Sequence, residues 1–342
     1  MADGTGLEQP HIHHHRKAHR YGLVLTLVLI AMTVLTLPLV FHSIETELFS
    51  RQDTVLYNGL TGVELPQTPP QVTAKSDTFV TVGVLDVDQV NSMVTLAVSG
   101  NRFCQTRACS TLDLHFYALD NNVTQRRGVP PVQTLTLKPE DVMFSQSLTL
   151  PIRGTPNMYP FDTYQLWLGV SGTVTEQGQP PREMNLEGFQ AGVEVALQNL
   201  DNTLIMAQPV PIPADSVHSP TDPYNFLAVQ SLSFREPTYL VVLAVMLVLM
   251  ISVSSGIAMT TKNYQDLVLG VGGIVLSVWG VRSILAVSSA RGVTLLDLSL
   301  SVVILLLLLT FVVRSALFFH QHSDLPPVRE IRPLKPIGRL RK

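Results

Sequence analysis

The chain has 342 residues; 46% are hydrophobic, 14% are charged, and the formal net charge is −3. A soluble domain usually carries about 25% charged residues, so this composition argues against an ordinary cytosolic enzyme. The mean hydropathy is +0.28, and the apolar residues gather in four blocks separated by polar segments. The composition therefore indicates an integral membrane protein.

The amino-terminal flank, residues 1–21, is basic and rich in histidine, and we expect it to be disordered and cytoplasmic. Its histidines could bind a transition metal only weakly, because a flexible tract lacks the supporting hydrogen bonds of a metal site. Residues 22–41 form an apolar run longer than the roughly 7–15 residues of a signal-peptide core, and no Ala-x-Ala site follows it. This run predicts a retained first transmembrane helix.

Residues 42–237 alternate apolar and polar positions in short runs that are separated by Gly, Pro and Asn. This period of two predicts about seven to nine strands in an antiparallel β-sandwich outside the membrane. Proline-rich stretches at 65–71, 178–182 and 209–223 are expected at edges and connectors, the last as a stalk. The segment contains 20 acidic and 10 basic residues, which suits a soluble surface and argues against nucleic acid as a partner.

The chain has two cysteines, Cys104 and Cys109, and both lie in this outer segment. An oxidising compartment favours a disulfide between them. Free thiols, or a redox or metal role, are the alternatives. A metal or redox site is disfavoured because His115 is the nearest histidine and no second cysteine pair exists.

The most distinctive string in the outer segment is Tyr159-Pro160-Phe161-Asp162-Thr163-Tyr164. Pro160 fixes one backbone angle, and Asp162 can accept backbone N–H bonds within a turn. The string therefore predicts either a corner of the sandwich or a loop that contacts the membrane helices or a partner.

Residues 238–260, 266–288 and 293–319 are three further apolar blocks, each long enough to cross a bilayer. Their short connectors predict antiparallel neighbours. Arg282 and Asp297 then lie at a similar depth in adjacent helices, which predicts an intramembrane ion pair that acts as a structural clamp. Small residues in 266–288 favour close helix packing and are compatible with a homo-oligomer.

The carboxyl-terminal segment, residues 320–342, is a basic, proline-rich tail that we expect to contact anionic lipid headgroups. Basic residues flank both ends of the chain, so the positive-inside rule predicts a multi-pass protein with both termini in the cytoplasm. The expected location is the plasma membrane, specifically a bacterial inner membrane.

The YPFDTY string followed by three apolar helices resembles an uncharacterised family of four-span bacterial membrane proteins known only as a domain of unknown function. That family's pattern also has an Asp opening the third helix, an Arg late in it, and a Gly-x-x-x-x-Asp stretch entering the fourth. Asp266, Arg282 and 292–297 stand at the matching places. The resemblance implies an architecture and no activity.

The Pro-Phe-Asp turn is also similar to the signature loop of pentameric ligand-gated channels, in which an outer β-sandwich adjoins four helices. This chain departs from that pattern because one helix precedes the sandwich and its cysteines do not flank the turn. A channel of this kind is therefore only an analogy.

No nucleotide-binding loop, hydrolase elbow or zinc-protease helix occurs in the sequence, and the cytoplasmic parts are too short for a folded domain. We therefore expect no enzyme and no cofactor. The leading hypothesis is a membrane protein whose outer β-sandwich binds a protein partner or ligand, with the bilayer as its other partner. The alternatives are a channel or transporter subunit with a ligand-sensing outer domain, and an outer-face enzyme.

Overall fold

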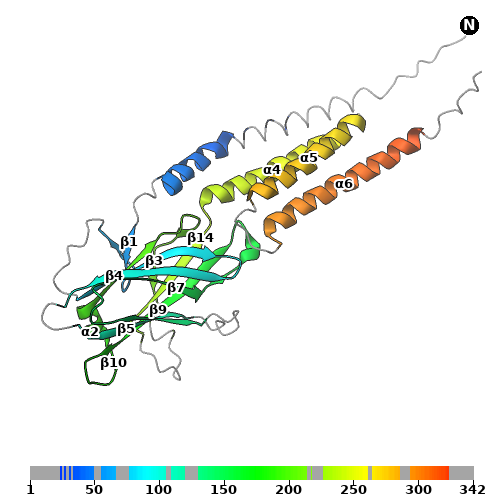
Figure 1. The fold of residues 1–342 in the computed structure, drawn as a ribbon. Helices are drawn as coiled ribbons and strands as arrows, with labels where there is room; N and C mark the ends of the chain where they lie inside the picture. The colour runs from blue at the N-terminus through cyan, green and yellow to red at the C-terminus, as the bar shows by residue number, and fades with distance from the viewer. Residues whose placement is uncertain are drawn as a thin grey trace, which may run out of the picture.

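The computed structural model describes a domain of two β-sheets and a group of helices that extends from one end of it (Figure 1). The residues described are 24, 27, 31, 34–49, 55–66, 77–104, 109–119, 130–213, 217, 226–260, 264–285 and 293–322. Among them are nine strands of three residues or more and five of two residues.

The first sheet has six strands in the order β2-β1-β11-β3-β4-β7. They are β1 (Leu56–Asn58), β2 (Glu64–Leu65), β3 (Thr78–Asp88), β4 (Met93–Arg102), β7 (Met143–Pro151) and β11 (Val193–Asn199). The long β3–β4 hairpin is closed by Asp88, whose Oδ1 accepts a hydrogen bond from the Asn91 amide at 2.9 Å. Ser92 in the same turn has a φ of 54°.

The second sheet has eight strands and follows the path β12-β14-β9-β5-β6. They are β5 (Thr111–Ala118), β6 (Val132–Leu137), β9 (Thr163–Thr175), β12 (Ile205–Met206) and β14 (Ala228–Arg235). Three two-residue strands are added at its margins, namely β8 (Arg153–Gly154), β10 (Arg182–Glu183) and β13 (Val210–Pro211).

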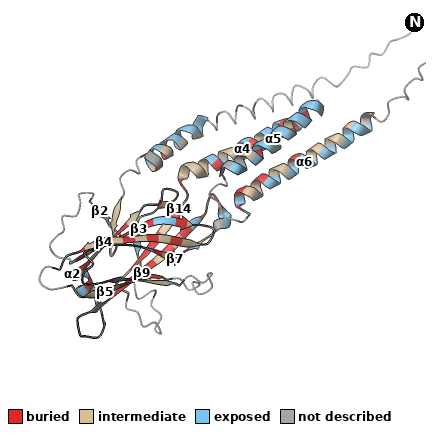
Figure 2. Cartoon of the chain, viewed as in Figure 1, coloured by how far each residue is buried: buried red, intermediate tan, exposed pale blue. Residues whose placement is uncertain are grey.

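The hydrophobic core is formed by buried residues of both sheets, and Figure 2 shows these residues along their strands. In β9 the buried positions Tyr164, Leu166 and Leu168 alternate with more exposed ones, as a strand covered on one face requires. The opposing sheet contributes Val94, Leu96 and Val98 in the same alternation. The period of two in the sequence therefore corresponds to a real β-sandwich.

The sandwich is not purely antiparallel, contrary to the sequence-based expectation. Strand β11 pairs with β3 in parallel, with Val193 opposite Thr78. The chain crosses from the second sheet to the first through the short helix α2 (Leu186–Gly192), which Asn185 caps through the Gly188 amide at 2.9 Å. It therefore enters the first sheet at the same end as β3. The prediction of a stalk at 209–223 is also partly wrong, because Val210–Pro211 pairs with β14 as an edge strand. Residues 214–216 and 218–223 of that stretch lie outside the described residues.

Three long helices follow the sandwich: α4 (Thr238–Thr260), α5 (Tyr264–Leu285) and α6 (Leu295–His322). Two segments, Thr238–Ala258 and Leu295–His320, are long and apolar enough to cross a membrane. In α5 the apolar stretch Gln265–Gly280 is shorter than these two segments. Within the described residues the structure thus supports two spans rather than the four expected.

The first predicted span is described only at a few residues and from residue 34 onward, where a helix leads into the π-helical turn Glu45–Phe49. It lies beside α4, since Thr36 Oγ1 is 3.4 Å from Met246 Sδ. Figure 1 shows its described part running alongside α4. The flank 1–21 and the tail from residue 323 lie outside the described residues.

Candidate functional site

The two ends of the sandwich differ, and each holds a candidate site. At the junction end, β3 finishes, β9 starts, and β14 leads into α4. At the far end, β3 starts and both β4 and β9 finish. The same two strands, β3 and β9, therefore run from one candidate site to the other.

The YPFDTY turn lies at the junction end and reaches into the helices. A short 3-10 helix, Pro156–Met158, leads into a cis Tyr159–Pro160 peptide bond, and the Phe161 amide donates to the Met158 carbonyl at 2.8 Å. The Tyr159 side chain is buried in one hydrophobic cluster with residues of all three helices: Ala244, Ile251, Val278, Leu296 and Leu300. This turn is therefore part of the core of the helices as well as a corner of the sandwich.

Asp162 and Tyr164 of the same motif are both buried, with 1% and 0% of their surface exposed. The Tyr164 hydroxyl donates a hydrogen bond of 2.7 Å to Asp162 Oδ2. Burial raises the pKa of Asp162, although this hydrogen bond opposes the rise, and burial also raises the pKa of Tyr164. The two side chains thus form a hydrogen bond that is buried away from solvent.

A second buried carboxyl, Glu236, stands next to this pair. It accepts a hydrogen bond of 2.9 Å from Gln89 Nε2 in the β3–β4 turn. Burial, with smaller contributions from Asp162 and Asp201, raises its pKa to about 7, while the bond from Gln89 acts in the opposite direction. Burial and the nearby Glu236 also raise the pKa of Tyr159 to about 12. Residues of four segments thus meet in one polar cluster.

Glu47 joins the first helical segment to the start of α4. Its carboxylate accepts hydrogen bonds from the Thr238 amide and the Thr238 hydroxyl, both at 2.7 Å. Ser43 donates to it at 2.9 Å, and Arg235 lies 4.0 Å away. An acidic group at the amino terminus of a helix is stabilised by free backbone N–H groups and by the helix dipole. Glu47 therefore caps α4 from another segment of the chain.

Pro160 and Phe161 of the same turn line an apolar groove of about 410 Å³ between α4 and α6. Its two hydroxyl groups are already bonded to backbone, since Ser252 donates to Val248 and Ser299 to Leu296, each at 2.7 Å. The groove therefore presents hydrocarbon to any occupant.

The far end of the sandwich contains a pocket of about 770 Å³ between the two sheets. The disulfide Cys104–Cys109 lies on its wall, with a Cα–Cα distance of 5.6 Å. Apolar wall residues come from both sheets and the adjoining loop: Leu112, Val174, Met184 and Val193. Asp77 and Glu176, which are exposed, stand at its rim. The size and mixed lining fall within the range of small-molecule sites.

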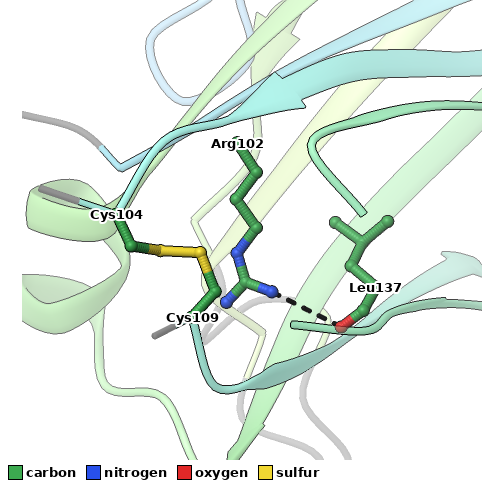
Figure 3. The surroundings of a disulfide bond; sticks show 4 residues. All are labelled: Arg102, Cys104, Cys109 and Leu137. Atoms are coloured by element: carbon green, nitrogen blue, oxygen red, sulfur yellow. Dashed lines mark hydrogen bonds between the residues drawn. A yellow bond between two sulfur atoms is a disulfide. The ribbon is translucent and has the colours of Figure 1, made fainter. Parts of the chain in front are cut away.

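Arg102 also lines this pocket, and only 6% of its surface is exposed. Its guanidinium crosses from the first sheet to the second and passes beside the disulfide (Figure 3). Its contact there is a long hydrogen bond of 3.4 Å from Nη1 to the Leu137 carbonyl, and Nε has no partner among the described residues. Burial lowers its pKa, which Asp77 and Asp141 partly oppose. A guanidinium has five N–H donors, and within the described residues the one on Nε is buried without a partner.

Arg282 and Asp297 are brought together, with Nε 2.7 Å from Oδ1. Asp297 Oδ2 also accepts from the Thr294 amide at 3.2 Å, while the Asp297 amide donates to Thr294 Oγ1 at 3.2 Å, which is a capping box at the start of α6. The side chain of Arg282 is 59% exposed and that of Asp297 17%. Asp297 is therefore both a helix cap and an ion-pair partner.

The candidate residues that the sequence had pointed to fall into separate places: the cysteines in the far pocket, the turn motif at the junction, and the ion pair beyond it. Arg102, Gln89, Glu236 and Glu47 were missed. Glu236 could be noticed only as an acidic residue near the start of an apolar block, and nothing local distinguishes Arg102 from other arginines. Within the described ranges no group of three or more His, Cys, Asp or Glu could hold a metal ion. The histidine tract lies outside them.

Residues 68–212 match a family described as a domain of unknown function (DUF4436). The matched region holds both cysteines, Arg102 and the YPFDTY turn, and it ends before α4. It fits the expected resemblance to an uncharacterised family. No curated protein matches the chain.

Proposed function

We propose that this chain is a membrane-anchored binding protein: the β-sandwich stands outside the plasma membrane, binds a ligand or protein partner at its far end, and catalyses no reaction. The pocket around Arg102 carries this proposal. It lies at the end of the sandwich opposite the helices, where an outer domain is open to solutes and other proteins.

In this proposal four helices cross the membrane and both termini are cytoplasmic. The Glu47–Thr238 contact supports this arrangement, because it puts the end of the first helical segment level with the start of α4. Arg282 and Asp297 then hold α5 and α6 in register near the outer surface, and the basic tail 320–342 contacts anionic lipid. Alkaline phosphatase fused after residue 213 should be active and after Lys262 or Lys342 inactive; the reverse pattern contradicts the topology.

The binding role can be tested by identifying what co-purifies with the full-length protein in mild detergent. The informative comparison is between Arg102→Gln and Arg182→Gln, since Arg182 is exposed on β10 close to the pocket but does not line it. A small molecule or protein that is lost with the first variant and kept with the second supports the proposal. Identical recovery from both variants contradicts a binding site in this pocket.

A second candidate function is a channel or transporter subunit with a ligand-sensing outer domain. The position of Tyr159 favours it, because a side chain of the sandwich packs inside the cluster of three helices. Such a contact could transmit a change at the far pocket to the helices along β9. Flux in proteoliposomes that changes in Tyr159→Ala would support this function. Absence of flux together with a monomeric detergent complex would contradict it.

A further inference from the structure

The unpartnered Nε of Arg102 narrows the class of ligand that the far pocket could bind. A buried polar group without partners is costly and calls for an explanation. Arg102 is buried, yet within the described residues it makes one long hydrogen bond and has no ion pair. A carboxylate matches a guanidinium fork in a bidentate geometry. A carboxylate ligand would therefore complement Arg102, whose nearby charges are those of Asp77 and Asp141.

The rim adds a second constraint. Asp77 and Glu176 are exposed carboxylates, one from each side of the gap between the sheets. With Arg102 they give the pocket one positive group inside and two negative groups at its mouth. A dianion would meet repulsion on entering, whereas a ligand with a cationic end would be attracted. The charges thus match a molecule with an anionic group at the floor and a cationic group at the rim.

The wall of the pocket is mixed. Leu112, Val174, Met184 and Val193 supply hydrocarbon surface, and neighbouring residues such as Thr111 and Thr175 supply polar groups. A pocket of about 770 Å³ is larger than a single amino acid needs and has room for a short peptide. A ligand with apolar side chains would bury them against this wall.

We propose that the far pocket binds a zwitterionic amino-carboxylate, either an amino acid with an apolar side chain or a short apolar peptide, with its carboxylate on Arg102 and its ammonium group facing Asp77 and Glu176. This inference rests on the proposed function and assigns the chemistry of its ligand.

The test is thermal unfolding of the full-length protein in detergent with a matched set of probes. Leucine and trileucine carry both charged groups, isocaproate lacks the ammonium group, and isoamylamine lacks the carboxylate. Binding of a ligand to the folded state raises the melting temperature. We expect a rise with leucine or trileucine, a smaller one with isocaproate and none with isoamylamine. A rise with trileucine alone identifies a peptide site, and one of similar size with leucine identifies an amino-acid site.

Variants separate the two charged contacts. Arg102→Gln should weaken binding of the zwitterions by about 10- to 100-fold, the usual value of a charged hydrogen bond. Asp77→Asn and Glu176→Gln lie at exposed positions and should fold normally; each should reduce the preference for leucine over isocaproate by about 2- to 5-fold. Arg182→Gln is the control and should change neither quantity.

The inference is overturned if no probe changes the melting temperature, or if Arg102→Gln and Arg182→Gln respond equally. The experiments can show that the proposed ligand class is wrong while the proposed binding function still holds. If the probes have no effect but a native molecule still co-purifies in an Arg102-dependent way, the pocket binds something else and only the zwitterion assignment is wrong.

Discussion

At the junction end of the sandwich, buried side chains form short hydrogen bonds with one another, although Asp162 Oδ1 has no partner within the described residues. At the far end, the buried guanidinium of Arg102 makes only one long hydrogen bond within the same residues. Tyr164 donates to Asp162 and Gln89 to Glu236, and the neighbouring Tyr159 is packed among three helices. Arg102 has one hydrogen bond of 3.4 Å and an unpartnered Nε within the described residues. Short hydrogen bonds between buried side chains give a defined geometry, while an unpartnered donor beside a pocket is suited to a ligand. This difference is the basis for proposing attachment at one end and ligand binding at the other.

The largest effect at the junction should come from Tyr159→Ala. The change removes a side chain that is 2% exposed and leaves a cavity among the three helices, so we expect a loss of about 3–5 kcal/mol in unfolding free energy. Denaturation of the full-length protein in detergent measures it. Phe161→Ala is the matched control, because Phe161 is 50% exposed in the same turn. Equal losses would show that the turn is not anchored by Tyr159.

The unfolding free energy should also depend on pH because of Glu236, and the expected change is nearly as large. Its pKa is about 7 in the folded state against 4.5 in the unfolded chain, so the unfolded state loses its proton first as pH rises. The stabilising contribution is complete below pH 4.5 and is lost as the pH rises to about 7, by an amount on the order of 3 kcal/mol. Glu236→Gln should flatten this part of the stability curve.

Glu140→Gln, at an exposed position on the sandwich, is the control for that pH curve and should leave its slope unchanged. Gln89, Asp162 and Asp201 all interact with Glu236, so Asp162 contributes in the same direction and some slope should persist in Glu236→Gln. A slope identical to that of the unaltered protein would show that Glu236 is ionised in the folded state.

Tyr164→Phe tests the hydrogen bond without changing the shape of the side chain. Loss of the hydroxyl leaves Asp162 buried without its 2.7 Å donor, and we expect a cost of about 1–3 kcal/mol in unfolding free energy. The control is Tyr57→Phe, which removes the hydroxyl of a half-buried tyrosine in β1. A cost below that of the control would mean that Asp162 is protonated and finds another partner.

Removal of the Glu47 carboxylate should have a smaller effect. Glu47→Gln weakens the capping of Thr238 at the start of α4, and loss of a helix cap costs about 0.5–2 kcal/mol. The same denaturation experiment measures it, with Glu140→Gln as a control that changes the charge equally. If the two variants are equally stable, the contact between the first helical segment and α4 contributes nothing to attachment.

The sequence predicted the parts of the fold that depend on local periodicity. Alternation along 163–170 is enough to identify β9 as a strand covered on one face, and the uncharged run after Thr238 is enough to identify α4. The parallel pairing of β11 with β3 was not predictable, because it depends on where α2 returns the chain to the first sheet. Pairing between distant segments has no signature in either strand alone.

The same reasoning explains the outcome for the candidate sites. The YPFDTY motif was visible because its residues are contiguous, and so was the pair of cysteines. The cluster of Gln89, Asp162 and Glu236 joins residues up to 147 positions apart, and the burial of Arg102 arises only when the two sheets pack together. A sequence reveals which residues are polar, but burial and the absence of partners are properties of the packed structure.

At the far end, Arg102→Met should change stability by less than about 1 kcal/mol, because replacing a poorly bonded buried charge by an apolar side chain of similar length is often neutral or stabilising. This near-zero change in unfolding free energy contrasts with the losses of stability expected for the junction variants. The denaturation experiment used for Tyr164→Phe measures it directly, and binding of trileucine should be lost in the same variant. A loss of stability as large as that of Tyr164→Phe would mean that Arg102 holds the two sheets together, and the contrast between an attaching end and a recognising end would then fail.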